Sequence, residues 1–207
     1  MNTAVKICGL TRVDDALAAA RLGAHATGFV FYARSPRNVT PAQAAEMIRR
    51  LPPFVTSVGL FVNADTQFVE RVLDETPLDL LQFHGEESPA YCRQFRKPFI
   101  KALRVRPGVD LLQYALQFEG ARGLLLDAFV EHKHGGTGAS FDWDLIPPGL
   151  PLPVVLSGGL NAGNAAAAIR RVRPCAVDVS SGVESAPGIK DAQKLAEFFQ
   201  GVRDADG

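Results

Sequence analysis

Eight short segments rich in Val, Ile, Leu and Phe recur along the chain at nearly regular spacing. They begin at residues 5, 26, 56, 78, 99, 123, 153 and 176. Segments with helical periodicity separate most of them, such as "TRVDDALAAARLG", "TPAQAAEMIRRL" and "NAGNAAAAIRRV". Several apolar segments are continuous rather than alternating, which is typical of parallel strands covered on both faces. This pattern predicts an α/β protein, a (β/α)₈ TIM barrel that forms one compact domain over residues 1–207.

The alternative fold is a doubly wound open sheet, which rarely contains eight such evenly spaced units. Thr11, Thr40 and Asn161 are the predicted N-caps of three helices, and Gly23 is predicted to end the first helix. The sixth connection, "SFDWDLIPPGL", contains prolines and predicts only a short or irregular helix. The last residues, "RDADG", are expected to form a frayed tail.

The charge balance argues against partners that are bound through a strong electric field. The chain has 22 Lys and Arg and 22 Asp and Glu, so neither nucleic acid nor a membrane is an expected partner. The first predicted strand begins too early to leave room for a signal peptide, and no apolar stretch approaches a membrane helix in length. The cysteines at 8, 92 and 175 lack the spacing of a metal site or disulfide framework, so a cytoplasmic location is expected.

In a barrel of this kind, the active site lies where the strands end and the following loops begin. Polar residues at these positions are Cys8, the segment 34–37, Asn63, His84, Arg104, Asp127, Ser157 and Ser180. Lys6 and Asp178 lie two residues before the ends of the first and last strands, on the same strand faces as the end residues. We expect these two side chains to form an ion pair inside the mouth of the barrel.

Two segments rich in Gly and Ser, "LSGGLNAGNA" and "DVSSGVE", follow the last two predicted strands. Glycine lets a backbone approach a ligand closely, and consecutive N–H groups in a turn bind anions. Either segment alone would suit a tight turn. Because both occur at adjacent strands, they predict a phosphate site formed by Gly158, Gly159, Ser180 and Ser181.

Three further side chains have alternative interpretations. Arg37, in the loop "FYARSPRNVT", has a guanidinium group suited to a carboxylate, although loop arginines are commonly just exposed. Asp127 ends the run "LLLDA", where apolar surroundings favour a protonated carboxyl group that can donate a proton. An ion pair or a cap is the alternative for Asp127. Cys8 is either a buried apolar side chain or a reactive thiol.

The histidines give weaker indications. His84, in "QFHGEE", is expected to form a hydrogen bond with its own loop rather than act in acid–base chemistry. His132 and His134, in "EHKHGG", resemble a metal site only superficially, because a charged loop flanked by glycine is usually solvated. No metal site is expected there.

Together, these motifs resemble one known family. The segments "KICGLT", "GFVFY…SPR.V", "VGLFVN", "LQFHGEE", "LLLDA", "GGTG..FDW", "LSGGLN..N" and "AVDVSSGVE..PGIKD" are similar to those of phosphoribosylanthranilate isomerase of tryptophan biosynthesis. The resemblance extends from the first strand to the last helix. "SGGL" occurs in other phosphate-binding barrels, whereas "KICG" with "SPR" and "DVSSGVE" is much more specific.

The resemblance implies a cofactor-free Amadori rearrangement of N-(5-phosphoribosyl)anthranilate to 1-(2-carboxyphenylamino)-1-deoxyribulose 5-phosphate. It implies that Cys8 is the general base, Asp127 the general acid and Arg37 the group that binds the anthranilate carboxylate. We expect Asp178, with the Gly and Ser residues above, to bind this phosphorylated small molecule. A cysteine base needs a lowered pKa, and Lys6 on the same strand face is a candidate source of it.

Two alternatives remain open at this point. Lys6 or Lys101, if desolvated, could form a Schiff base with a sugar phosphate, and trapping with borohydride would detect the adduct. The fold could also serve a non-catalytic sugar-phosphate sensor, although an acid–base pair at two strand ends favours an enzyme. The sequence does not distinguish a monomer from a homodimer.

Overall fold

The computed structural model describes residues 3–128 and 142–206 of the chain. Within them, eight parallel strands form a closed barrel in which each strand pairs with the next and β8 pairs with β1. The strands are β1 (Ala4–Cys8), β2 (Ala26–Val30), β3 (Thr56–Phe61), β4 (Leu80–Phe83), β5 (Phe99–Val105), β6 (Leu124–Ala128), β7 (Val154–Leu156) and β8 (Ala176–Val179). Each strand lies at one of the eight apolar segments, and the predicted TIM barrel is confirmed.

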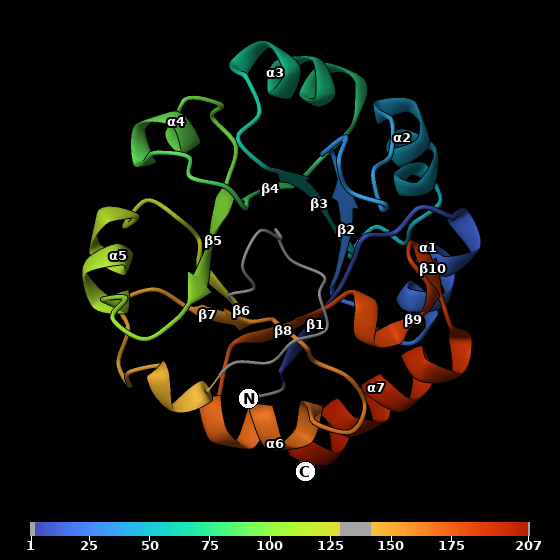
Figure 1. Cartoon of the computed structure of the whole chain (residues 1–207). Coiled ribbons are helices and arrows are strands. Elements are labelled where there is room, and N and C mark those ends of the chain that lie inside the picture. The colour runs from blue at the N-terminus through green and yellow to red at the C-terminus, as the bar shows by residue number, and fades with distance from the viewer. Residues whose placement is uncertain (1–2, 129–141, 207) are drawn as a thin grey trace.

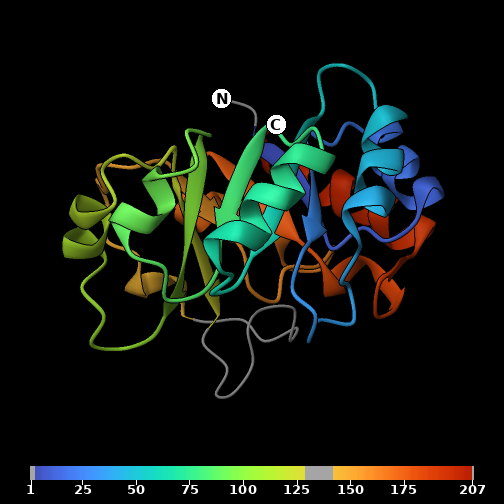
Figure 2. The same ribbon diagram turned by 90° about the horizontal axis from the view of Figure 1, so that it is seen from above.

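Helices surround the strands, as the view along the barrel in Figure 1 shows. They are α1 (Val13–Arg21), α2 (Pro41–Arg49), α3 (Thr66–Glu75), α4 (Pro89–Arg93), α5 (Leu111–Gln117), α6 (Ala165–Val172) and α7 (Ala192–Asp206). Figure 2, turned by 90°, shows the same helices outside the strands. The described part of the connection from β6 to β7 contains only the 3₁₀ helix η1 (Trp143–Leu145), as its prolines predict. None of the described helices is long and apolar enough to cross a bilayer.

The ends of the first two helices agree in part with the predicted caps. Thr40 caps α2 in a capping box, because its side chain accepts from Gln43 N–H and the Gln43 side chain accepts from Thr40 N–H. Gly23, with a φ of 100°, follows the C-cap of α1 as predicted. Thr11 is not a cap, because its hydroxyl donates to the carbonyl of Gly188 and α1 begins two residues later.

Two predictions in the C-terminal part need correction. Asn161 is not the cap of α6: its side chain accepts a hydrogen bond from Gly163 N–H at 2.8 Å in the preceding turn, and Asn164 occupies the cap position. The predicted frayed tail is helical, because α7 includes residues 203–206. Arg170 of α6 donates to the carbonyl of Asp204 at 2.6 Å and so ties the last turn of α7 to its neighbour.

The connection from β8 to α7 contains the 3₁₀ helix η2 (Ser181–Val183) and an antiparallel pair, β9 (Glu184–Ala186) and β10 (Ile189–Lys190). Figure 1 places this pair beside α1. The backbone N–H of Lys190 donates to Asp15 of α1 at 3.0 Å. The pair therefore returns to the side of the barrel where β1 ends.

Strand side chains alternate between two packed layers. The outer layer, between strands and helices, contains the fully buried Phe29, Phe61 and Phe83. Each such side chain stabilises the fold by about 1.5–3 kcal/mol. The inner layer includes a buried cluster that contains Leu125 and Val155. Because side chains two positions apart share a strand face, Asp127 and Ser157 face the mouth of the barrel.

Candidate active site

Lys6 and Asp178 form a buried ion pair at the mouth of the barrel. They are register partners on β1 and β8, and Lys6 Nζ donates to Asp178 Oδ1 at 2.8 Å. The ion pair expected from the sequence is therefore confirmed. Among the described residues, Asp178 Oδ2 accepts only a long hydrogen bond of 3.4 Å, from the Ser157 hydroxyl, which leaves it able to accept another.

The Cys8 thiol lies beside this pair, at the end of β1. Cys8 Sγ and Lys6 Nζ both lie over Gly28 of β2, where any side chain would crowd both atoms. Burial raises the pKa of the Cys8 thiol, and the Lys6 ammonium, which lowers it, only partly offsets burial. The prediction of a lowered thiol pKa is therefore wrong for the protein without ligand, in which the thiol is protonated at neutral pH.

Asp127, the predicted acid, ends β6 and is held at both carboxyl oxygens. Oδ1 accepts from Ala128 N–H at 2.9 Å, and Oδ2 lies 3.1 Å from His84 Nε2. The other ring nitrogen, His84 Nδ1, lies 2.9 Å from Gln82 Nε2. Because an amide N–H only donates, Nδ1 accepts in this arrangement and Nε2–H donates to Asp127. The expectation that His84 bonds its own loop is wrong.

The loop after β4 explains why His84 faces the mouth instead. The Glu87 carboxylate accepts from the N–H groups of Asn63 and Gly85 at 2.8 and 2.9 Å. The wholly buried Lys101 donates to the Gly85 carbonyl at 2.6 Å and lies 3.1 Å from Glu87. These groups hold the loop without help from the imidazole.

The two lysines considered as Schiff-base nucleophiles do not suit that role. Lys101 is on the outer face of β5, with Nζ over the Phe118 ring of the helical layer at 5.7 Å from its centroid. Burial lowers the pKa of Lys6, but Asp178 and Cys8 outweigh it, so that the net pKa is raised. Lys6 therefore remains an ammonium ion, which cannot attack a carbonyl group.

A hollow lies between the loops that follow β7 and β8, next to Asp127 and Asp178. Its lining consists of Asp127, Ser157, Gly158, Gly159, Leu160, Asp178, Val179, Ser180, Ser181 and Gly182. Gly158 and Gly159 have φ values of 85° and 65°, which other residues rarely adopt. Among the described residues, the backbone N–H groups of these glycines and the hydroxyls of Ser180 and Ser181 donate no hydrogen bond. The four residues of the predicted phosphate site thus lie together, with donors unused.

Gly182, which was not predicted from the sequence, keeps these two loops in contact. A Cβ atom at this position would overlap the carbonyl of Leu160 in the loop after β7. Any other residue would therefore separate the loops and widen the hollow. Gly182 lies in the segment "DVSSGVE", but its role becomes evident only from its contact with the loop after β7.

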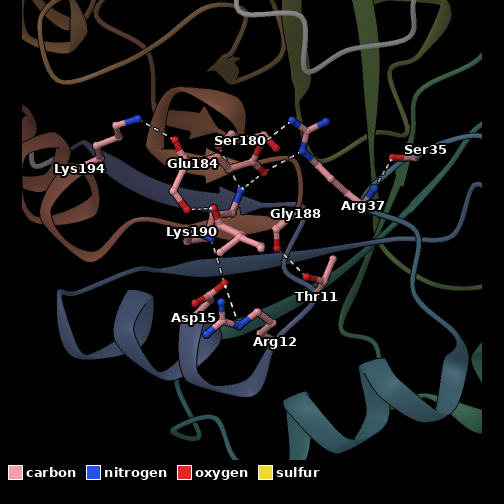
Figure 3. A network of polar contacts seen from close by, with 12 residues as sticks. Thr11, Arg12, Asp15, Ser35, Arg37, Ser180, Glu184, Gly188, Lys190 and Lys194 are labelled. Carbon is pink, nitrogen blue, oxygen red and sulfur yellow. Dashed lines mark hydrogen bonds and ion pairs between the residues drawn. The ribbon is translucent and has the colours of Figure 1, made fainter.

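Arg37 is not an exposed loop arginine, because Glu184 of β9 holds its guanidinium group (Figure 3). Arg37 Nε donates to Glu184 Oε1 at 2.8 Å, and Nη2 donates to Oε2 at 2.6 Å. The Arg37 stem crosses Gly9, the residue after Cys8, which places the guanidinium at the edge of the mouth. The structure thus brings Arg37 to the site, already paired with a carboxylate.

Lys190 completes this network, and neither Lys190 nor Glu184 was predicted from the sequence. Lys190 Nζ donates to Glu184 Oε1 at 2.8 Å and to the Ser180 carbonyl at 3.0 Å. Burial raises the pKa of Glu184, but Arg37 and Lys190 outweigh it and leave the carboxyl ionised, with a lowered pKa. Both residues lie in the motif "AVDVSSGVE..PGIKD", yet nothing in their spacing indicates a contact with residue 37.

His132 and His134 lie outside the described residues. Within residues 3–128 and 142–206, no group of three or more His, Cys, Asp or Glu side chains is arranged to hold a metal ion.

Comparison with known proteins connects this geometry to one family. The family pattern N-(5'phosphoribosyl)anthranilate (PRA) isomerase matches residues 5–201. A relative from Thiobacillus denitrificans, named N-(5'-phosphoribosyl)anthranilate isomerase, is 62% identical over 96% of this chain and 97% of its own. A relative of the same name from Nitrosospira multiformis is 58% identical over 98% of this chain and 97% of its own.

Solved structures agree. Phosphoribosyl anthranilate isomerase from Thermotoga maritima has a TM-score of 0.90 at 41% identity and covers 98% of this chain and 99% of that one. A structure of phosphoribosyl anthranilate isomerase in complex with reduced 1-(o-carboxyphenylamino)-1-deoxyribulose 5-phosphate has a TM-score of 0.83 at 39% identity. It covers 98% of this chain and 99% of that one.

Proposed function

The chain belongs to the N-(5'-phosphoribosyl)anthranilate isomerase family, and we propose that Cys8 and Asp127 catalyse its reaction as general base and general acid. The protein is an isomerase of tryptophan biosynthesis that converts N-(5'-phosphoribosyl)anthranilate to 1-(2-carboxyphenylamino)-1-deoxyribulose 5-phosphate. In the barrel, β7 and β8 separate β6 from β1. Asp127 and Cys8 therefore lie on either side of the hollow formed by the loops after β7 and β8. This arrangement is the main observation that supports the proposal.

Asp127 acts in the first step, the opening of the ribose ring. A proton delivered to the ring oxygen breaks its bond to C1 and leaves an iminium ion between C1 and the anthranilate nitrogen. The donor must carry a proton, whereas in the arrangement described above both Asp127 oxygens accept hydrogen bonds, from Ala128 N–H and from His84 Nε2–H. In the other His84 tautomer, Nε2 accepts from the protonated acid, and Nδ1–H donates to Gln82 Oε1 once the Gln82 amide has turned over, because Nε2 of that amide faces Nδ1 in this structure. That oxygen is buried and has no partner among the described residues.

Cys8 acts in the second step. The iminium ion makes the C2 hydrogen acidic, and a thiolate removes it to give an enolamine, which becomes the ketone when C1 is protonated. The new cation and Lys6 both favour the thiolate over the thiol. In the overall reaction C2 is oxidised and C1 reduced within one molecule, so the proposed chemistry requires no cofactor.

The remaining site residues hold the ends of the substrate. We assign the phosphate to Gly158, Gly159, Ser180 and Ser181, whose N–H and O–H donors are unused within the described chain. We assign to Asp178 Oδ2 the acceptance of a hydrogen bond from a ribose hydroxyl, which its single long contact with Ser157 supports. Arg37, at the edge of the mouth, is assigned to the anthranilate carboxylate.

Turnover of freshly prepared phosphoribosylanthranilate by the purified protein, followed as product formation, tests the proposal. Conversion that Cys8→Ser and Asp127→Asn abolish is the expected result. Binding without conversion by the wild-type protein would favour the sensor alternative instead. Borohydride treatment should trap no adduct, because the proposed mechanism forms no bond to the protein.

We propose a cytoplasmic enzyme with a small-molecule partner and no nucleic-acid or membrane partner, which the unpaired Cys8, Cys92 and Cys175 and the balanced charge support. One related structure is that of monomers generated from the dimeric phosphoribosylanthranilate isomerase of Thermotoga maritima. Sedimentation analysis would decide between monomer and homodimer for this chain.

A further inference from the structure

A guanidinium group has two edges that can each bind a carboxylate through a pair of parallel hydrogen bonds. One edge consists of Nε and Nη2, and the other of Nη1 and Nη2. In Arg37, Glu184 occupies the Nε–Nη2 edge. Among the described residues Arg37 Nη1 has no hydrogen-bond partner, and it carries no dashed line in Figure 3.

From this geometry we propose that Glu184 is a positioning residue, which fixes the plane of the Arg37 guanidinium so that the free Nη1–Nη2 edge receives the substrate's anthranilate carboxylate. The inference rests on the proposed function, in which Arg37 binds that carboxylate. Glu184 itself touches no substrate atom. It acts by removing the rotational freedom that an unpaired arginine side chain would lose on binding.

Glu184 is held by more contacts than its ion pair with Arg37 alone. Its carboxylate is bound by Arg37 at two atoms and by Lys190 at a third contact of 2.8 Å. Its backbone carbonyl accepts from Lys194 Nζ at 2.7 Å, and β10 is tied to α1 through Asp15. Figure 3 shows these groups converging on Glu184 from both sides. The carboxylate is therefore a rigid reference point for the guanidinium plane.

Lys190 explains why Glu184 does not repel a second carboxylate. With Lys190 protonated, Arg37 and Lys190 carry two positive charges against the one negative charge of Glu184; burial lowers the pKa of Lys190, and the contact with Glu184 works against this and favours its ammonium form. The cluster therefore keeps one net positive charge for the ligand, although the Nε–Nη2 edge is already occupied. Without Lys190, the ligand carboxylate would approach an ion pair with no net charge.

Glu184→Gln separates orientation from charge, because the two effects act in opposite directions. The glutamine keeps the shape, but its NH₂ group opposes one of the N–H donors, so the guanidinium is released. At the same time the cluster becomes more positive. A site governed by charge alone would bind a carboxylate more tightly in this variant, whereas a site governed by orientation would bind it less tightly.

Calorimetry with two probes measures this. The first is reduced 1-(o-carboxyphenylamino)-1-deoxyribulose 5-phosphate, and the second is the same compound made from aniline, without the carboxyl group. For Glu184→Gln we expect the Kd of the first probe to rise by at least about tenfold, the value of a lost hydrogen-bonded contact to a charged group. The Kd of the aniline probe should stay within about twofold, because the phosphate contacts that supply its affinity are unchanged. Unchanged or tighter binding of the first probe would overturn the inference.

Two controls make the result specific. Glu46→Gln removes an exposed glutamate that holds Arg49 and Arg50 on α2, and it should change neither Kd. Arg37→Ala tests the underlying assignment. If Arg37→Ala weakens both probes equally, Arg37 does not bind the carboxylate, and the function assigned to it fails. If Arg37→Ala weakens binding of the first probe but not of the aniline probe, and Glu184→Gln shows no such difference, only the inference about Glu184 fails.

A second variant keeps the test decisive if Glu184→Gln does not fold. Glu184→Asp retains the charge but withdraws the carboxylate by one methylene group, so it no longer reaches both nitrogens of Arg37. The same selective loss of the first probe is expected, together with a raised KM and little change in kcat. Equal affinity of Glu184→Asp and wild type for that probe would contradict the inference.

Discussion

His84 Nε2 lies 3.1 Å from Asp127 Oδ2, so that a histidine from the end of β4 is joined to the proposed acid at the end of β6. Gln82 holds the opposite ring nitrogen at 2.9 Å. All three side chains are buried. Asp127 is therefore hydrogen-bonded to an imidazole that can donate to a carboxylate in one tautomer and accept from a carboxylic acid in the other.

His84→Leu tests this connection. We expect kcat to fall by about 10–100-fold, the loss that is typical when the hydrogen-bonding partner of a metal-ligating side chain is removed. KM should change little, because His84 is not assigned a substrate contact. His84→Gln restores a donor to Asp127 without a second tautomer and should recover only part of the loss. Steady-state kinetics measure this. A leucine variant with the kcat of the wild type would show that His84 contributes only packing.

The raised pKa of Cys8 predicts a rate that increases with pH. Only the thiolate is a base, and a raised pKa means that the thiolate fraction is small at pH 7 and grows as pH rises. The kcat/KM of the free enzyme should therefore climb between pH 7 and pH 9, by up to about tenfold per unit. A flat profile over this range would contradict Cys8 as the base.

Alkylation by iodoacetamide gives the same information without substrate. The Cys8 peptide, followed by mass spectrometry, should be modified faster at pH 9 than at pH 7 in parallel with kcat/KM. Cys92 is the matched control, because it is also buried and burial raises its pKa to about 12. It should remain unmodified at both pH values.

Gly159→Asp tests the phosphate site. The substitution places a negative charge where unused N–H donors line the hollow, and it strains a backbone with a φ of 65°. KM should rise sharply, and inorganic phosphate should no longer compete with the substrate. Gly108→Asp is the matched control, since Gly108 has a φ of 87° with no atom near its missing Cβ. If phosphate never inhibits the wild type at millimolar concentration, the phosphate site is misplaced.

Lys101→Met tests whether the lysine in β5 supports the fold. It would leave the Glu87 carboxylate buried without its counter-ion, so the free energy of unfolding should fall by about 3–5 kcal/mol. Denaturation in urea measures this, with Glu46→Gln as an exposed control that should leave the midpoint unchanged. A methionine variant as stable as the wild type would show that Lys101 does not hold the loop after β4.

The barrel and the ends of its strands were predictable, because a strand covered on both faces leaves a continuous apolar run that repeats along the chain. The same regularity placed Cys8, Asp127 and the two loops with Gly and Ser at one end. The pairing of Lys6 with Asp178 followed from the closure of the barrel, which makes their strands neighbours.

Three features were beyond the sequence, because each depends on how distant segments meet. Glu184 reaches Arg37 only because β9 and β10 fold back toward α1, across 147 positions of the chain. The contact of His84 with Asp127 depends on the loop after β4 being satisfied by Glu87. Whether the pKa of Cys8 is raised or lowered depends on how completely the thiol is buried, which its charged neighbours alone do not reveal.

The most direct test of the acid–base assignment compares Asp127→Asn with the wild type, measuring turnover and binding of the reduced product analogue separately. Asparagine keeps the size of the side chain but has no acidic proton to transfer. The account predicts that kcat falls by at least about a thousandfold, or about 4 kcal/mol of barrier, while the Kd of the analogue stays within a few-fold. An asparagine enzyme that turns over within about tenfold of the wild type, a difference of only about 1.4 kcal/mol, would show that another residue donates the proton.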